Sequence, residues 1–162
     1  MAKIGIISGY FNPIHPGHVS MIQESRSLCD FLVVIVNSDL QVKIKGSTPF
    51  MDEWARCEIV KNIKGVYDVF LSVDQDSTVV KSIEQINNKF KSNFLGESNK
   101  IFFGNGGDRG PNASQVPEVQ FCQNNDIELV YGLGDTKRYS SSRLISDSTC
   151  WGATQENQDL DD

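Results

Sequence analysis

No uninterrupted apolar stretch in this sequence approaches the ~20 residues that a membrane-spanning helix requires. The N-terminal residues Met1–Ile4 lead directly into an apolar run of strand length, and they show none of the parts of a signal peptide. We therefore expect a protein that has no membrane segment and resides in the cytoplasm.

An excess of positive charge is also missing. The formal net charge is −6, and the last seven residues, Glu156–Asp162, hold four acids and no base, which leaves 15 basic against 17 acidic side chains in the rest. We predict a single domain over residues 1–150, followed by an acidic, disordered tail over residues 151–162. Because no basic excess exists, we do not expect a nucleic-acid polymer as a partner.

Cysteine is scarce, and none of its positions forms a CxxC pair. The four cysteines are Cys29, Cys57, Cys122 and Cys150. Spacing of this kind gives no support to a zinc site or a disulfide framework. We interpret these residues as reduced thiols that pack as small apolar side chains.

Short apolar runs alternate with segments of helical length. The predicted strands are Lys3–Ser8, Phe31–Asn37, Val66–Val73, Lys100–Gly104 and Ile127–Tyr131. The predicted helices are His18–Cys29, Asp52–Ile63, Ser77–Lys91 and Pro117–Asn124, with another that begins near Ser142. Strands that are apolar on both faces suit a parallel sheet covered on both sides. The pattern therefore predicts an α/β fold, a three-layer sandwich with a five-stranded, mostly parallel sheet.

Apolar spacing also predicts which helix faces are buried. In the segment Asp52–Ile63, the residues Ala55, Ile59 and Ile63 recur at helical spacing, so we expect them to face the sheet. The segment Ser77–Lys91 has the clearest pattern of this kind.

Four polar segments rich in glycine or serine follow predicted strands. They are Gly9–His18, Lys43–Gly46, Gly104–Asp108 and Tyr139–Ser142. In open parallel sheets, ligands bind outside the carboxyl ends of the strands. We therefore expect these four segments to contribute to one shared site.

The first of these segments, GYFNPIHPGH, contains both histidines of the chain. His15 and His18 flank Pro16-Gly17 at the start of a predicted helix, whose free N–H groups and dipole favour phosphate. Two imidazoles at such a place are suitable donors to phosphate oxygens. A chance surface pair and one half of a zinc site are the alternatives, although no other histidine exists to complete a zinc site.

The segment GYFNPIHPGH resembles the GxFDxxHxGH signature of the cytidylyltransferase-like superfamily of nucleotidyltransferases. The resemblance extends from Lys3 to about Ile145, and it is strongest toward glycerol-3-phosphate cytidylyltransferase and the adenylyltransferase domain of the ADP-heptose pathway. Further matching positions are Asn37-Ser38-Asp39, Lys43, Lys45-Gly46, Arg56, Gly106-Gly107-Asp108 and Ser140-Ser141-Ser142. The resemblance implies a Rossmann-like domain, a homodimer and Mg²⁺ bound with the triphosphate.

Residue roles follow from the same resemblance. His15, His18, Lys43 and Lys45 would be catalytic, with the choice between the two lysines left open. The nucleotide-binding positions would be Gly9, Tyr10, Phe11, Asn12, Gly17, Gly106, Gly107, Asp108, Ser140, Ser141 and Ser142. Asp39 and Arg56 would serve the phosphate of the acceptor, although a surface ion pair is the simpler interpretation of Arg56.

Three positions depart from the family pattern. Asn12 replaces the usual Asp, Arg109 replaces an aromatic residue, and Asp135 stands where the cytidylyltransferases have an arginine. These positions lie where base and acceptor would be recognised, so they leave both substrates undetermined.

The sequence thus predicts an enzyme that transfers CMP or AMP from CTP or ATP to a sugar or polyol phosphate and releases pyrophosphate. A different acceptor, such as phosphopantetheine or nicotinamide mononucleotide, is one alternative. A non-catalytic nucleotide-binding module is the other.

Overall fold

The computed structural model of the protein describes residues 1–106 and 116–134. Strands and helices alternate along these residues. The strands are β1 (Lys3–Gly9), β2 (Phe31–Val36), β3 (Val66–Leu71), β4 (Lys100–Gly106) and β5 (Glu128–Leu133). The helices are α1 (Pro16–Ser27), α2 (Asp39–Ile44), α3 (Glu53–Lys61), α4 (Val80–Phe90) and α5 (Val116–Asn124).

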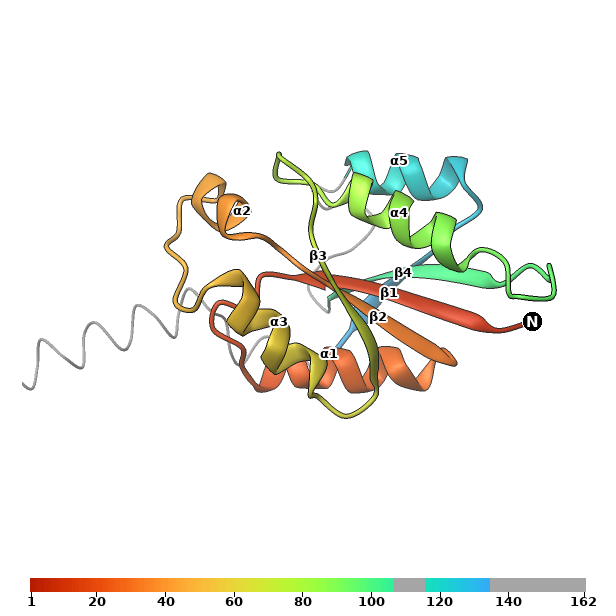
Figure 1. The fold of residues 1–162 in the computed structure, drawn as a ribbon, viewed down its shortest axis with the longest axis horizontal. Helices are drawn as coiled ribbons and strands as arrows, with labels where there is room; N and C mark the ends of the chain where they lie inside the picture. Colours follow the sequence, from red (N-terminus) through yellow and green to blue (C-terminus); the bar gives the residue numbers. More distant parts are fainter. Residues whose placement is uncertain (107–115, 135–162) are drawn as a thin grey trace, which may run out of the picture.

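The five strands form one sheet in the order β3-β2-β1-β4-β5, and every neighbouring pair is parallel. Helices α1 and α3 cover one face and α4 and α5 cover the other (Figure 1). The predicted three-layer α/β fold is confirmed, with the sheet entirely parallel. The strand order reverses between β1 and β4, and a crevice at such a switch point is the usual ligand site of this architecture.

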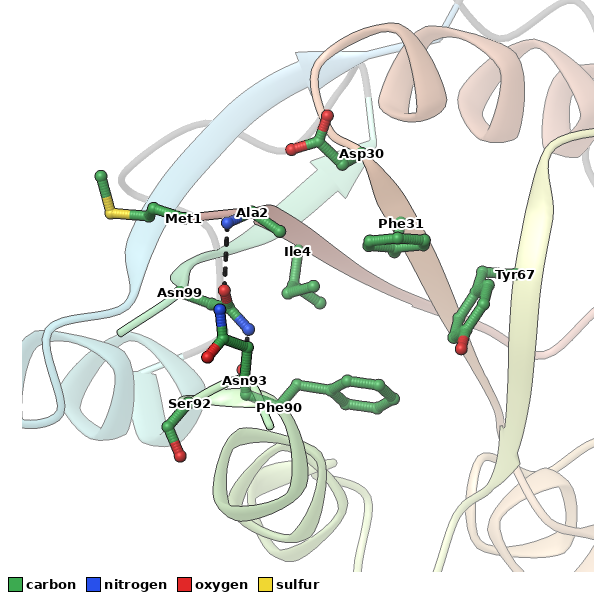
Figure 2. A pocket seen from close by; sticks show the side chains of 10 residues that line it. All are labelled: Met1, Ala2, Ile4, Asp30, Phe31, Tyr67, Phe90, Ser92, Asn93 and Asn99. Atoms are coloured by element: carbon green, nitrogen blue, oxygen red, sulfur yellow. Dashed lines mark hydrogen bonds between the residues drawn. The ribbon is translucent and has the colours of Figure 1, made fainter. Parts of the chain in front are cut away.

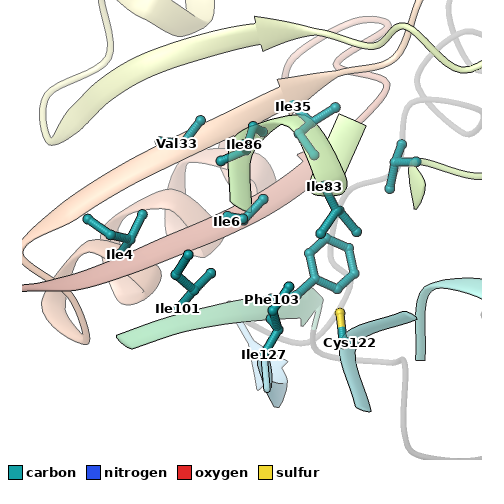
Figure 3. Close-up of a cluster of buried hydrophobic side chains, with 11 residues drawn as sticks. Ile4, Ile6, Val33, Ile35, Ile83, Ile86, Ile101, Phe103, Cys122 and Ile127 are labelled. Carbon is teal, nitrogen blue, oxygen red and sulfur yellow. The ribbon is translucent and has the colours of Figure 1, made fainter. Parts of the chain in front are cut away.

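An apolar cluster fills each side of the sheet. Ile6 and Ile7 are both completely buried, yet they belong to opposite clusters because successive strand residues point to opposite faces. Figure 3 shows the cluster beneath α4 and α5, in which Ile83 of α4 meets Phe103 of β4. Burial on both faces explains why the strand sequences lack polar alternation.

The buried face of α3 differs from the prediction at Ile59, whereas Ile63 packs against the core as expected. Ile59 is 37% exposed, whereas Arg56 and Val60 are the buried residues of this helix. The apolar spacing was misleading because it ignored Arg56, whose guanidinium finds enough partners inside the protein to be buried.

The short helix α2 was not predicted. It begins after Ser38, whose hydroxyl accepts from the N–H of Gln41 at 3.2 Å, while the side-chain oxygen of Gln41 accepts from the N–H of Ser38 at 3.1 Å. This reciprocal pair is a capping box, and the Ser-x-x-Gln spacing was its signal in the sequence. Within residues 1–106 and 116–134, the other predicted boundaries lie within three residues of the observed ones, and the helix predicted to begin near Ser142 lies outside the described residues.

The cysteines within the described residues confirm their predicted role. Cys29, Cys57 and Cys122 are free thiols, and the first and last are buried. Burial and the nearby Glu118 raise the pKa of Cys122 to about 12, so this thiol stays protonated. Cys150 and the predicted acidic tail lie outside the described residues.

None of the helices within residues 1–106 and 116–134 has the length and apolarity needed to cross a membrane.

Candidate active site

The histidine segment, Gly9–His18, connects β1 to α1 at the edge of the sheet where the carboxyl ends of the strands lie. His15 is the N-cap of α1 and Pro16 occupies its first turn, where the missing N–H of proline costs nothing. The N–H groups of the first turn point out of the helix, and the helix dipole adds partial positive charge at this end. The edge is thus suited to an anion.

The two histidine rings stack on each other. Their centroids lie 3.8 Å apart at an interplanar angle of 24°. The N–H of Gly17 donates to Nδ1 of His15 at 3.1 Å, and the N–H of His15 donates to Nδ1 of His18 at 3.2 Å. Because both Nδ1 atoms accept, the ring hydrogen of each histidine lies on Nε2. The local fold therefore prepares two neighbouring Nε2–H donors.

His18 is neutral at physiological pH. Burial, together with the nearby His15 and Lys45, lowers the pKa of His18 to about 3. The ring of Phe11, which is 1% exposed, lies 4.7 Å from that of His18 and contributes to this desolvation. We conclude that His18 would act on an anion as a neutral hydrogen-bond donor.

The low pKa of His18 predicts acid sensitivity. At pH 7 the folded state is unprotonated at His18 and the unfolded state mostly so, but below the ordinary pKa of 6.5 the unfolded state alone takes up the proton. We expect His18 to lower the free energy of unfolding by about 2 kcal/mol at pH 5 relative to pH 7. Urea unfolding of wild type and His18→Asn at both pH values measures this. An equal pH dependence in the two proteins would contradict it.

Gly9 is required by packing against Phe11. A Cβ atom at Gly9 would lie 2.9 Å from the Phe11 ring, closer than a Cβ contact permits. Phe11 itself has a φ of 50°, which turns the chain sharply after the strand. Phe11 thus supports the ring of His18, and Gly9 leaves room for the Phe11 ring, two roles that the sequence did not indicate.

The two candidate lysines occupy different positions. Lys43 lies in the last turn of α2 and is exposed, while Lys45 caps the C-terminus of α2. The ammonium of Lys45 lies 4.4 Å from the centre of the Tyr10 ring, a cation–π contact, and its charge contributes to the low pKa of His18. The structure therefore brings Lys45 to the histidine segment.

Asn12 connects the histidine segment to the segment that precedes α3. Its side-chain nitrogen donates to the carbonyl of Thr48 at 2.9 Å, and its side-chain oxygen accepts from the N–H of Phe50. The side chain is buried, at 4% exposure. The structure thus gives the Asn12 side chain a positioning role within the protein.

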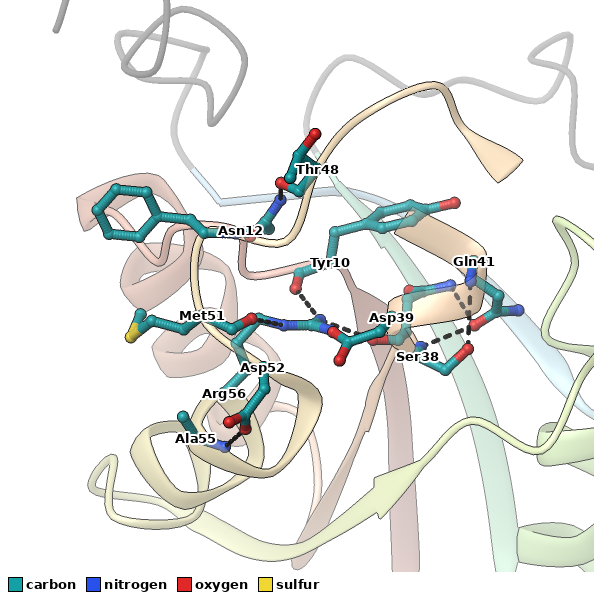
Figure 4. Close-up of polar contacts among 12 residues, drawn as sticks. Tyr10, Asn12, Ser38, Asp39, Gln41, Thr48, Met51, Asp52, Ala55 and Arg56 are labelled. Atoms are coloured by element: carbon teal, nitrogen blue, oxygen red, sulfur yellow. Dashed lines mark hydrogen bonds and ion pairs between the residues drawn. The ribbon is translucent and has the colours of Figure 1, made fainter. Parts of the chain in front are cut away.

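Arg56 lies at the centre of a polar network that joins four segments (Figure 4). Its guanidinium donates to three backbone carbonyls: Tyr10 at 2.7 Å, Asn37 at 2.6 Å and Met51 at 3.1 Å. It also pairs with the Asp39 carboxylate at 2.7 Å.

The Arg56 side chain is fully buried, and that of Asp39 is 26% exposed. The ion pair suggested by the sequence is present, but it is not a surface pair, because its guanidinium is fully buried. The guanidinium binds groups of the protein itself and thereby fixes the ends of β1 and β2 relative to α2 and α3. The role of Asp39 and Arg56 toward the phosphate of the acceptor stays a prediction.

The fourth strand ends at the same edge. Gly106 is its last residue, and a Cβ there would lie 3.7 Å from the sulfur of Met21 in α1. Asn105, which sequence reasoning did not single out, is buried beside it. Gly107, Asp108 and the segment Ser140–Ser142 lie outside the described residues.

No group of three or more His, Cys, Asp or Glu side chains within residues 1–106 and 116–134 could hold a metal ion. A divalent cation at this edge would therefore need ligands from elsewhere, such as the oxygens of a bound triphosphate.

A cavity lies at the opposite edge of the sheet (Figure 2). Its lining includes Ala2, Phe31 and Tyr67, which come from the amino ends of β1, β2 and β3. It is therefore separate from the histidine segment, which lies at the carboxyl ends.

Comparison with known families gives a match over most of the chain. A family model described as cytidylyltransferase-like matches residues 6–145. The bifunctional protein HldE of Rhodopseudomonas palustris is 40% identical over 77 residues, which are 46% of this chain and 16% of that protein. The FAD synthase of Ferroglobus placidus is 40% identical over 86 residues, 53% of this chain and 54% of that enzyme. The chain thus spans only part of these relatives.

Solved structures share the fold. A lipopolysaccharide core biosynthesis protein from Thermoplasma volcanium superposes with a TM-score of 0.61 at 19% identity, over 84% of this chain and 100% of that one. A bifunctional NMN adenylyltransferase/ADP ribose pyrophosphatase from Francisella tularensis, complexed with AMP and a manganese ion, gives 0.60 at 15% identity, over 88% and 40%.

Proposed function

Since the chain belongs to the cytidylyltransferase-like family, as its sequence predicted, we propose that it transfers a nucleotidyl group from CTP or ATP to a small phosphorylated acceptor. ATP is the first donor to test, because the relatives at 40% identity include HldE, a bifunctional protein with the adenylyltransferase domain of the ADP-heptose pathway. A sugar or polyol phosphate is the acceptor class that the sequence favours. The proposed assembly is a homodimer, and the proposed location is the cytoplasm.

The observation that carries the proposal is the arrangement of His15 and His18. Two Nε2–H donors stand side by side at the first turn of a helix, at the switch point of a parallel sheet. Backbone hydrogen bonds fix both rings before any ligand arrives, so little reorganisation is needed at the moment of reaction. Such an arrangement fits a triphosphate better than an uncharged ligand.

The proposed reaction needs no protein nucleophile. A phosphate oxygen of the acceptor attacks the α-phosphorus of the nucleotide in line, the new P–O bond forms, and the bond to the β-phosphate oxygen breaks, so that pyrophosphate leaves with the electron pair. Catalysis then depends on positioning and charge stabilisation. His15 and His18 would donate to oxygens whose negative charge increases in the transition state. Mg²⁺ held by the phosphates would neutralise further charge.

A pyrophosphate-release assay tests this proposal. The protein is incubated with Mg²⁺, each of four nucleoside triphosphates and a panel of sugar phosphates, polyol phosphates, phosphopantetheine and nicotinamide mononucleotide. We expect pyrophosphate in proportion to a nucleotidylated product, found by mass spectrometry, with at least one pair. Nucleotide binding without product from any pair would favour a non-catalytic module.

The two lysines provide a matched comparison. We expect Lys45→Met to lower kcat by about 100-fold, because the ammonium beside His18 would stabilise charge on the transferring phosphoryl group. Lys43→Met, two residues away on the same short helix, should change kcat by less than about threefold. Steady-state kinetics of the pyrophosphate assay measure both. A larger fall in kcat for Lys43→Met than for Lys45→Met would instead assign the catalytic role to Lys43.

A further inference from the structure

The amide of Asn105 is buried without a hydrogen-bond partner for its nitrogen. The residue is 3% exposed, and no partner for Nδ2 exists among residues 1–106 and 116–134. Buried amide donors in native proteins nearly always have a partner, so an exception requires an explanation.

Strand alternation determines the face on which Asn105 lies. A Cβ at Gly104 would meet Leu133 and Ile7, and one at Gly106 would approach Met21 of α1, so both glycines face the side of α1. Asn105 lies between them and therefore faces the side of α4 and α5, as do Ile101 and Phe103.

Asn105 also lies at the switch point of the sheet. It is the last residue but one of β4, which pairs with β1, and the carboxyl end of β1 leads into the histidine segment. In the pairing of β4 with β5, Gly104 lies opposite Val130 and Gly106 opposite Leu133, so β5 carries an extra residue across from Asn105. Such bulges are frequent next to active sites, where they redirect the strand.

The charge of this side of the sheet differs from that of the histidine side. Its buried charged residues are Asp74, which accepts from the N–H and hydroxyl of Ser82, and Glu118, which accepts from the N–H of Val79. Within the described residues, no buried cation that would hold a second phosphate lies on this side, since the buried Arg56 lies on the side of α3. A neutral oxygen, which needs only a hydrogen-bond donor, is compatible with the two carboxylates.

We propose that Nδ2 of Asn105 donates a hydrogen bond to an uncharged oxygen, a hydroxyl or a carbonyl, of the acceptor substrate. The triphosphate would occupy the α1 side of the switch point and the uncharged part of the acceptor the α4/α5 side. This inference rests on the proposed function. Asn105 would distinguish acceptors by one polar group, since an analogue that lacks this group leaves the buried amide without a partner.

The test uses Asn105→Leu, which has a similar size but no donor, with Asn88→Leu on the exposed surface of α4 as the control. We expect Asn105→Leu to raise the acceptor KM by roughly 10- to 100-fold, with the nucleotide KM within about twofold of wild type. Tm should stay the same or rise, because the substitution removes an unpaired buried group.

Deoxy analogues of the accepted substrate complete the test without relying on the variant alone. With wild type, the analogue that lacks the oxygen bound by Asn105 should have a kcat/KM roughly 10- to 100-fold below that of the full substrate. With Asn105→Leu, the kcat/KM values of this analogue and of the full substrate should be nearly equal.

An equal rise in the KM of nucleotide and acceptor, or a fall in Tm with unchanged kinetics, would overturn the assignment of Asn105. Absence of product in wild type with every acceptor would instead overturn the proposed function, and the inference with it.

Discussion

Replacement of His18 by alanine is expected to lower kcat by at least about 100-fold while the Kd of the nucleotide changes by only a few-fold. The Nε2–H of His18 is a fixed donor whose hydrogen bond strengthens as negative charge increases on the phosphate oxygens. Loss of this donor should therefore destabilise the transition state more than the bound nucleotide. Because His18 is already neutral well above its pKa of about 3, its contribution should not titrate between pH 5 and 8. Steady-state kinetics and calorimetric nucleotide binding measure the two quantities separately.

The matched control is Val19→Ala, at the next position of α1, whose side chain is 39% exposed. It should leave both kcat and Kd near their wild-type values. Equal losses of affinity and turnover in His18→Ala would show that His18 only binds the ground state, which contradicts the role assigned to it.

Replacement of Arg56 by alanine is expected to lower the free energy of unfolding by about 3–5 kcal/mol. The substitution removes the partner of Asp39 and of three backbone carbonyls, and it leaves a cavity where four segments meet. The histidine segment should also become less ordered, because Arg56 holds the carbonyl of Tyr10. Urea unfolding at pH 7 measures the change.

Lys61→Ala is the control for Arg56→Ala, because it removes an exposed cation from the same helix. Its effect on the free energy of unfolding should stay within about 0.5 kcal/mol. A loss below about 1 kcal/mol in Arg56→Ala would mean that the buried network contributes little.

The sheet could be predicted because its signal is local. Runs such as Phe31–Val36 are apolar at every position, and a strand covered on both faces buries Leu32–Val36. Helix α2 escaped prediction because its six residues are too few to show an apolar period, and only its capping box marks it.

The candidate site could be predicted only in part. The spacing of His15 and His18 within a glycine- and proline-rich segment indicated both the edge and the phosphate chemistry. The distinction between Lys43 and Lys45 depends on where the chain places each ammonium, and only Lys45 contacts Tyr10. The burial of Arg56 and the unpaired amide of Asn105 arise from contacts between distant segments, which spacing along the chain does not reveal.

The central claim is that the protein cleaves a nucleoside triphosphate between its α- and β-phosphates and keeps the nucleotidyl group on the acceptor. Parallel reactions with the triphosphate radiolabelled at the α- or the γ-phosphate test it most directly. We predict that the α-label appears in the acceptor product and the γ-label in pyrophosphate, and that both transfers are lost together in His18→Ala. A γ-label found in the acceptor, or released as inorganic phosphate without pyrophosphate, would contradict the account.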